Sequence, residues 1–224
     1  MDKKSINILG LGNRSTLFYI NELNRQYNSF FGGFSTCPFI LYNANFDKIN
    51  PYLPNNFEKL KPALNAELNR IVHSEDSLLL IPNITLHETF DQLQIDTTIA
   101  HPIELTINKL INNNQNKATV LGSLYTMESI YLKDKFKQHG IELIEPSHKE
   151  KLYVDYFRQQ VYNKQETVKE IEEYQKTVNE YSQQHAVIIG CSELSIFPPS
   201  ETDNTYDMIN IQIDFAISHL LKNN

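Results

Sequence analysis

The stretch SINILGLGNRSTLFYINELN, residues 5–24, decides the fold class. Its apolar start leads into Gly10 and Gly12, which is typical of a buried strand that ends in a tight turn. Apolar residues then recur at helical spacing over residues 15–30. A strand, a glycine turn and a helix in this order predict the first part of a β–α–β unit.

The same alternation continues along the chain, and a second strand–glycine–helix unit begins at residues 117–123. Strands that alternate with helices of this length predict parallel sheets with helices on both faces. The expected strands are residues 5–12, 38–46, 77–85, 97–102, 117–123, 141–147 and 186–192, and the expected helices are 15–30, 55–73, 86–95, 103–113, 125–140, 149–163, 165–185 and 208–223.

The two halves of the chain resemble one another in this order of elements. We therefore predict an α/β fold of two similar lobes, each a parallel sheet flanked by helices, with the active site in the cleft between them. The expected first lobe comprises residues 1–100 and 210–224, and the second comprises 101–209. No linker rich in Pro, Gly or Ser separates them.

Composition excludes several classes of protein. The 224 residues are 41% hydrophobic and 21% charged, which predicts a packed core. The net charge of −7 argues against a general nucleic-acid binder, because phosphate binding needs a basic face. The apolar runs are too short for a membrane helix of about 20 residues, and no signal-peptide core opens the chain. Two cysteines far apart in sequence favour a cytoplasmic protein with free thiols.

Ligands of open parallel sheets bind beyond the carboxyl ends of the strands. The predicted sheet places mostly uncharged hydroxyl and amide groups there. No group has metal-ligand spacing, so no metal is expected. The segment GLGNRST lacks the third glycine of a dinucleotide loop and is better explained as a tight turn capped by Ser15 or Thr16. The candidate positions are Gly12–Thr16, Tyr42–Asn45, Asn83–His87, Ser123–Met127 and Gly190–Glu193.

Cys191 is the most reactive residue type among these positions. A helix N-terminus can lower a thiol pKa from its ordinary value of about 8.5, which would suit proton transfer or nucleophilic attack. The alternative is a small buried cysteine at a strand end. Ser192 and Glu193 favour the functional interpretation, because three polar groups on one turn are costly inside a core. Cys37 precedes a strand, away from these ends, and is interpreted as a half-buried thiol.

Four segments along the chain form a pattern: ILGLGNRSTLFYINELN, IPNITLHETFDQL, VLGSLYTMES and IIGCSELSIF. Together they resemble the aspartate/glutamate racemase family, and most of all its broad aspartate/glutamate racemases. The resemblance runs along nearly the whole chain, and GCSEL is similar to the family's Gly-Cys-Thr-Glu motif. It implies two α/β lobes related by a pseudo-two-fold axis. It also implies an amino-acid racemase that needs no cofactor and moves a proton on and off Cα.

The resemblance also implies roles for individual residues. Cys191 falls on the second-lobe acid/base, and Asn83 falls on the first-lobe catalytic position, with Thr85 on the threonine of that motif. The remaining matches are to substrate-binding positions: Ser15, Thr16, His87, Thr126, Ser192 and Glu193. Asn45, at a strand end, is a further binding candidate.

Asn83 departs from the family pattern, which has Cys or Thr at this position. An amide is not a useful base near neutral pH, although it can hold a carboxylate or enolate oxygen. The second proton transfer would then need Thr85, His87 or a water held by Asn83. Two alternatives stay open: a single-cysteine decarboxylase or isomerase of the same superfamily, and an impaired protein that only binds amino acids or carboxylates.

A small amino acid or dicarboxylate is the expected ligand. A second carboxylate would need a cation, for which Arg14 is the first candidate. Three cations in the second half, Lys149, Lys151 and Arg158, could also close over the site. The resemblance further implies a homodimer and a role in D-amino-acid metabolism.

Overall fold

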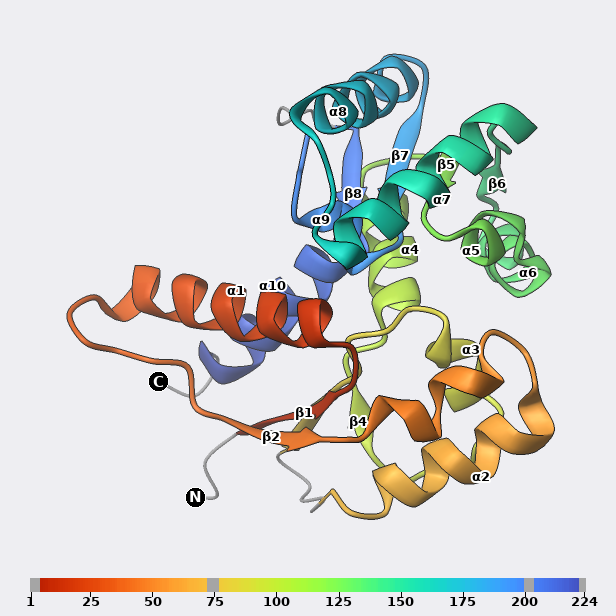
Figure 1. Ribbon diagram of the computed structural model, residues 1–224. Helices are drawn as coiled ribbons and strands as arrows, with labels where there is room; N and C mark the ends of the chain where they lie inside the picture. Colours follow the sequence, from red (N-terminus) through yellow and green to blue (C-terminus); the bar gives the residue numbers. More distant parts are fainter. Residues whose placement is uncertain (1–4, 72–76, 200–203, 222–224) are drawn as a thin grey trace. The chain divides into compact units, whose positions relative to one another are not determined.

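The computed structural model describes residues 5–71, 77–199 and 204–221 (Figure 1). The chain divides into two compact units. The first comprises Met1–His101 and Gln212–Asn224, and the second comprises Pro102–Ile211. Within the described ranges, no helix is both long and apolar enough to cross a membrane.

The first unit contains a four-stranded parallel sheet in the order β2-β1-β3-β4. Every residue of β3 is buried, as expected for a strand that is covered on both faces. From β1 the chain connects to β2 on one side of the sheet, and later to β3 and then β4 on the other side. The direction of winding therefore reverses between β1 and β3. The strands are β1 (Ser5–Gly10), β2 (Phe39–Asn43), β3 (Ser77–Leu80) and β4 (Thr98–Ile99).

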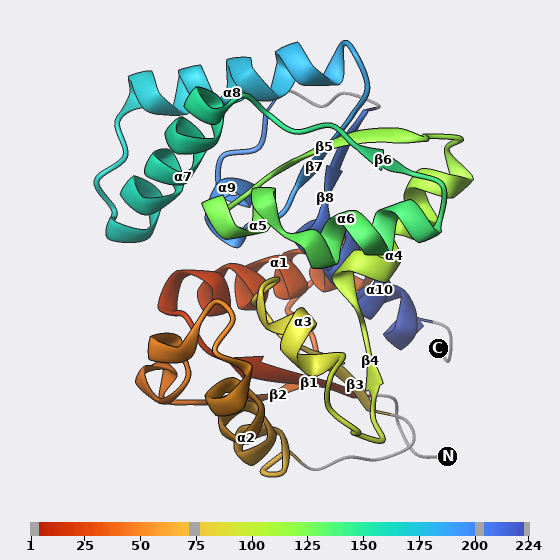
Figure 2. The same ribbon diagram turned by 90° about the vertical axis from the view of Figure 1, so that its right-hand side faces the viewer.

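Helices cover both faces of this sheet (Figures 1 and 2). On one face α1 lies beside the C-terminal part of α10, and the Tyr19 hydroxyl hydrogen-bonds the Gln212 side chain. On the other face α2 packs its leucines against β1 and β3. The helical elements are α1 (Asn13–Phe31), η1 (Phe46–Lys48), η2 (Asn50–Tyr52), α2 (Phe57–Leu68), α3 (Leu86–Phe90) and α10 (Met208–Leu221).

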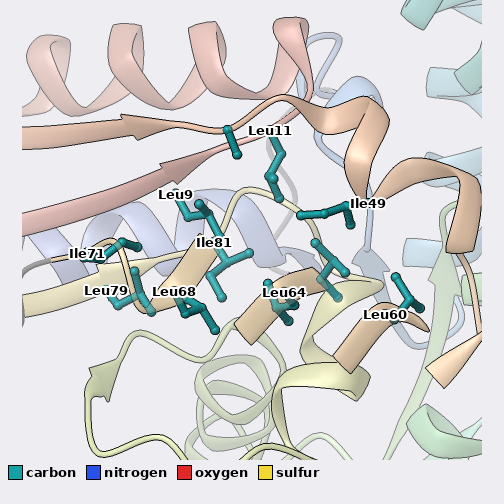
Figure 3. Packing of buried hydrophobic residues seen from close by; sticks show 11 residues of the cluster. Leu9, Leu11, Ile49, Leu60, Leu64, Leu68, Ile71, Leu79 and Ile81 are labelled. Carbon is teal, nitrogen blue, oxygen red and sulfur yellow. The ribbon is translucent and has the colours of Figure 1, made fainter. Parts of the chain in front are cut away.

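Figure 3 shows the core on the α2 face. Leu9 of β1 and Leu79 of β3 lie near Leu64 and Leu68 of α2, and all four are at most 1% exposed. Burying one such side chain contributes about 1.5–3 kcal/mol. This packing holds the ends of β1 and β3 at fixed positions.

The second unit repeats the sheet with the order β6-β5-β7-β8, again parallel throughout. Helices α7, α8 and α9 bury one apolar face against β5 and β7. Figure 2 shows α4 beside α6, where Lys135 and Glu104 form an ion pair of 2.6 Å. The strands are β5 (Lys117–Leu121), β6 (Glu142–Leu143), β7 (Ala186–Ile189) and β8 (Thr205–Asp207), and the helices are α4 (Pro102–Asn112), α5 (Leu124–Glu128), α6 (Ile130–Gln138), α7 (His148–Asn163), α8 (Val168–Ser182) and α9 (Ser192–Ser195).

Strand register makes two positions equivalent in the two units. Ile8 of β1 lies opposite Leu80 of β3, and Val120 of β5 lies opposite Ile188 of β7. When the glycine turns at Gly10 and Gly122, two residues beyond these pairs, are matched, the register places Asn83 at the position of Cys191. The equivalence of Asn83 and Cys191 therefore has a geometric basis within the two sheets.

Some expected elements differ in the structure. The helix expected over 125–140 is broken at Ser129, whose hydroxyl accepts from the Leu132 amide at 3.2 Å and so caps a separate helix, α6. The short strand β8 was not expected. The strand expected over 97–102 keeps only two residues, Thr98 and Ile99.

Candidate functional site

The ends of β5 and β7 meet at Thr126. A Cβ on Gly122 would lie 3.1 Å from the Thr126 methyl carbon Cγ2, and a Cβ on Gly190 would lie 3.3 Å from the same carbon. Larger residues at either glycine would therefore push Thr126 away. Ser123 caps α5 by accepting from the Thr126 amide at 3.2 Å, and their hydroxyls are 2.8 Å apart.

Cys191 follows β7 in an extended conformation, with φ −154° and ψ 130°. Its carbonyl accepts from the Leu194 amide at 3.1 Å, which satisfies the first turn of α9 through the main chain. The thiol Sγ donates to Glu193 Oε2 at 2.8 Å, and the Ser192 hydroxyl donates to the same oxygen at 3.2 Å. The three residues of the motif thus form one hydrogen-bonded group.

The thiol of Cys191 is partly buried. Burial, followed by the nearby Glu193 carboxylate, raises the Cys191 pKa well above its ordinary value, and the Arg158 charge opposes this. The expectation of a pKa lowered by a helix N-terminus is therefore wrong, because desolvation and a like charge dominate at this turn. Near neutral pH the sulfur carries its proton and can act as a proton donor.

Arg158 of α7 provides the positive charge at this turn. Burial acts to lower the Arg158 pKa, but the Asp155 and Glu193 carboxylates, and the Cys191 sulfur when it is ionised, raise it overall. Its Nε donates to Asp155 Oδ1 at 2.9 Å. The same oxygen accepts from the Leu124 amide at 3.1 Å, so Asp155 links α7 to the loop after β5.

In the first unit, Asn83 forms hydrogen bonds with residues of the helix that follows it. Its side-chain Oδ1 accepts from the Leu86 amide at 3.1 Å, which satisfies the start of α3. Its main-chain carbonyl accepts from His87 Nδ1 at 2.9 Å. The Asn83 side chain therefore offers no acid or base, in agreement with its chemistry.

His87 is fully buried and stacks edge to face on His101, with ring centroids 4.8 Å apart. Burial, followed by the charge on His101, lowers the His87 pKa to about 3. Because Nδ1 donates to a carbonyl, Nε2 carries the free lone pair, and it has no hydrogen-bond partner among the described residues. The predicted contact of His87 with substrate is not favoured by this burial and stays a prediction.

The turn after β1 is built by main-chain contacts. Gly12 is the N-cap of α1 and no side chain caps the helix, so the expected capping by Ser15 or Thr16 is wrong. Ser15 instead donates to the Gly12 carbonyl at 3.1 Å, and Thr16 Oγ1 accepts from the Leu11 amide at 3.1 Å. Both side chains are buried and tighten the turn.

The remaining candidates lie separately within the first unit. Thr85 precedes α3 and makes no capping hydrogen bond through its side chain. Asn45 is exposed and accepts from the Asp47 amide at 3.2 Å, which caps η1. Arg14 lies in the first turn of α1 and is partly buried. Their roles toward a substrate, and the predicted cleft between lobes, stay predictions.

Two site residues were not expected from the sequence. Asp155 fixes Arg158, and the only sequence signal for this was their spacing of three on a helix. Tyr174 is fully buried, and its hydroxyl has no hydrogen-bond partner within the described ranges. Burial raises the Tyr174 pKa, and the nearby Asp207 carboxylate, as well as the Cys191 sulfur when it is ionised, raises it further. No cluster of three or more described His, Cys, Asp and Glu side chains is arranged to hold a metal.

No family model and no curated protein sequence matches the chain. Solved structures match its fold, and three of them are described. A protein from Yersinia pestis, named as a proposed Asp/Glu racemase, has a TM-score of 0.79 at 19% identity, over 97% of this chain and 99% of that one. An aspartate racemase homologue from Pyrococcus horikoshii OT3 has a TM-score of 0.77 at 22% identity, over 96% and 98%. The aspartate racemase of Picrophilus torridus has a TM-score of 0.76 at 18% identity, over 97% and 94%.

At these identities the likeness establishes the fold. The predicted α/β class, with parallel sheets flanked by helices, is confirmed, and the three neighbours are Asp/Glu racemase homologues, as the resemblance implied.

Proposed function

We propose that this protein is an amino-acid racemase that needs no cofactor and acts on aspartate, glutamate or a related amino acid. The observation that carries the proposal is the Cys191 thiol bonded to Glu193 at the carboxyl end of β7. β5 and β7 flank the point where the strand order reverses, which is where ligands of open α/β sheets bind. The fold shared with aspartate racemase homologues supports it.

In this proposal Cys191 handles the proton on one face of Cα. The S–H bond breaks, the proton joins the carbanionic Cα, and the thiolate left behind is stabilised by the Arg158 charge. In the reverse direction the thiolate removes the Cα proton and the thiol is restored. Proton transfer of this kind contributes about 10²–10⁴-fold in rate.

The opposite face of Cα lacks an evident partner, because Asn83 is an amide occupied with the Leu86 amide. This observation favours a second candidate, decarboxylation of a malonate-like acid. There the bond to the departing carboxylate breaks, CO₂ leaves, and Cys191 delivers one proton to one face of the enediolate. This reaction needs one acid only.

Incubation in deuterium oxide separates the two reactions. The protein is mixed with L-Asp, L-Glu, L-Ala, L-Lys or a substituted malonate, and products are resolved by chiral chromatography and mass spectrometry. A racemase places deuterium at Cα in both enantiomers, whereas a decarboxylase releases CO₂ and yields one singly deuterated acid. Absence of exchange and of CO₂ with every compound, from protein whose melting temperature rises with malonate, would contradict both reactions and leave a binding protein.

A further inference from the structure

Arg158 is held beside the Cys191 turn by contacts within the second unit. Helix α7 packs against both α5 and α9. Val154 and Phe157, on the same helix, belong to the apolar cluster against which Cys191 packs. The Arg158 side chain is 22% exposed, so it is neither sealed in the core nor free on the surface.

Asp155 fixes the orientation of this guanidinium. Asp155 Oδ1 accepts from Arg158 Nε at 2.9 Å and from the Leu124 amide at 3.1 Å, while Oδ2 accepts from Gln159 at 2.7 Å. The carboxylate is thus tied to the loop after β5, and β5 lies next to β7. The guanidinium is anchored through Nε alone.

The two terminal nitrogens of Arg158 are available. Nη1 and Nη2 make no hydrogen bond with any described residue, and Asp155 is the only described carboxylate that forms an ion pair with Arg158. A planar guanidinium with two adjacent donors matches a carboxylate in a bidentate arrangement. A partly desolvated cation whose terminal donors bond no described residue favours such a ligand.

Two lysines of the second unit are paired within the protein. Lys151 binds Glu145 at 2.7 Å and Glu128 at 3.3 Å, and Lys133 binds Glu145 at 2.6 Å. These pairs neutralise the two ammonium charges within the protein. Arg158 differs from these two lysines in having two adjacent terminal nitrogens that bond no described residue.

We infer that Arg158 binds a carboxylate of the substrate, in a bidentate manner, next to the Cys191 thiol. The ligand class is a small carboxylic acid, which in the proposed function is an acidic amino acid. The inference deepens that function, but it concerns binding and holds for a decarboxylase or a binding protein as well. Asp155 is then a positioning residue that orients the guanidinium.

The test is calorimetric binding of malonate and L-Asp to Arg158→Lys, Arg158→Gln and Asp155→Asn. Arg158→Gln is expected to weaken both ligands by about 10- to 100-fold, the range of charge-assisted hydrogen bonds. Arg158→Lys keeps the charge but loses the paired donors, so a smaller loss is expected. Asp155→Asn retains an acceptor for Leu124 and is expected to lie between Arg158→Lys and the wild type. Lys176→Gln removes an exposed charge on α8 and serves as the matched control.

Unchanged dissociation constants in Arg158→Gln and Arg158→Lys would overturn the inference, even if both variants melt at lower temperature. Should Arg158→Gln fail to fold, the loss of affinity in Arg158→Lys decides. Comparison of L-Ala with L-Asp shows which carboxylate is held: a loss for both indicates the α-carboxylate, and a loss for L-Asp alone indicates the second one. Because binding is measured without turnover, a protein that catalyses nothing can still confirm or refute the carboxylate site.

Discussion

The turn after β3 and the turn after β7 occupy matching positions in their sheets, but different atoms accept the hydrogen bond from the start of the following helix. After β3, the amide at the start of α3 is satisfied by the side chain of Asn83, which accepts from Leu86 at 3.1 Å. After β7, the equivalent Leu194 amide is satisfied by the main-chain carbonyl of Cys191, also at 3.1 Å. Only in the second arrangement is the side chain at the strand end not needed for the start of the helix, and there the thiol bonds Glu193 instead.

The difference extends to the surroundings of each turn. The first carries His87, buried and neutral, with its pKa lowered to about 3. The second carries a thiol together with the Glu193 carboxylate and the Arg158 guanidinium, whose charges shift the thiol pKa in opposite directions. The comparison teaches that the same type of turn can have a structural or a reactive role. The role depends on whether a side chain or a main-chain carbonyl accepts the hydrogen bond from the first amides of the helix.

The strongest test of this comparison places a thiol at the end of β3 as well as at the end of β7. Asn83→Cys is expected to add a second acid/base and to raise racemisation by up to about 10²-fold, the low end of the range for general acid–base catalysis. Chiral chromatography of Asp and Glu measures it.

Asn83→Ala is the matched control, because it loses the same hydrogen bond to Leu86, worth about 0.5–1.5 kcal/mol, without adding a thiol. No gain in Asn83→Cys over Asn83→Ala would show that the equivalence of Asn83 and Cys191 has no catalytic meaning.

The buried histidine of the first turn predicts a specific loss of stability in acid. The folded-state pKa of His87 is about 3, below its ordinary value of 6.5, so between these values only the unfolded state binds the proton. Stability therefore falls as the pH drops from 6.5 toward 3, by about 2 kcal/mol between pH 7 and pH 5. Urea unfolding at the two pH values measures this.

His87→Gln should remove most of this pH dependence, whereas His139→Gln, at an exposed residue, should keep it. Equal pH dependence in wild type and His87→Gln would contradict the neutral, buried state of His87.

The smallest expected effect concerns the charge beside the thiol. The Glu193 carboxylate raises the Cys191 pKa, so Glu193→Gln is expected to lower that pKa and to speed alkylation by iodoacetamide a few-fold at pH 8. The rate is best measured in a Cys37→Ala background, where Cys191 is the only thiol. Glu172→Gln, an exposed carboxylate on α8, is the matched control and should leave the rate unchanged.

Much of the fold follows from local signals in the sequence. Apolar runs that end at Gly10, Gly122 and Gly190 mark the strand ends, and helical periodicity marks most of the helices. The position of Cys191 at the carboxyl end of a buried strand follows from the same signals. The break at Ser129 had a local signal too, since serine is a preferred N-cap.

The chemistry of the site depends on contacts that no local pattern contains. The Cys191 pKa is raised mainly by burial, which depends on tertiary packing, and Arg158, which opposes the rise, lies on α7 rather than on the Cys191 turn. The link between Asp155 and Leu124 joins two helices whose packing is tertiary. Asn83 accepts from the start of its helix through its side chain, and Cys191 does so through its main-chain carbonyl. This choice depends on backbone geometry, which residue types alone do not determine.

The most direct test of the central claim is loss of the α-proton of L-Asp in deuterium oxide, followed by proton NMR, with wild type and Cys191→Ser. If the thiol moves the proton, the wild-type protein exchanges the α-proton, and Cys191→Ser exchanges it at least about 10²-fold more slowly while still binding malonate. Equal exchange by both proteins would contradict the assignment of Cys191 as the acid/base.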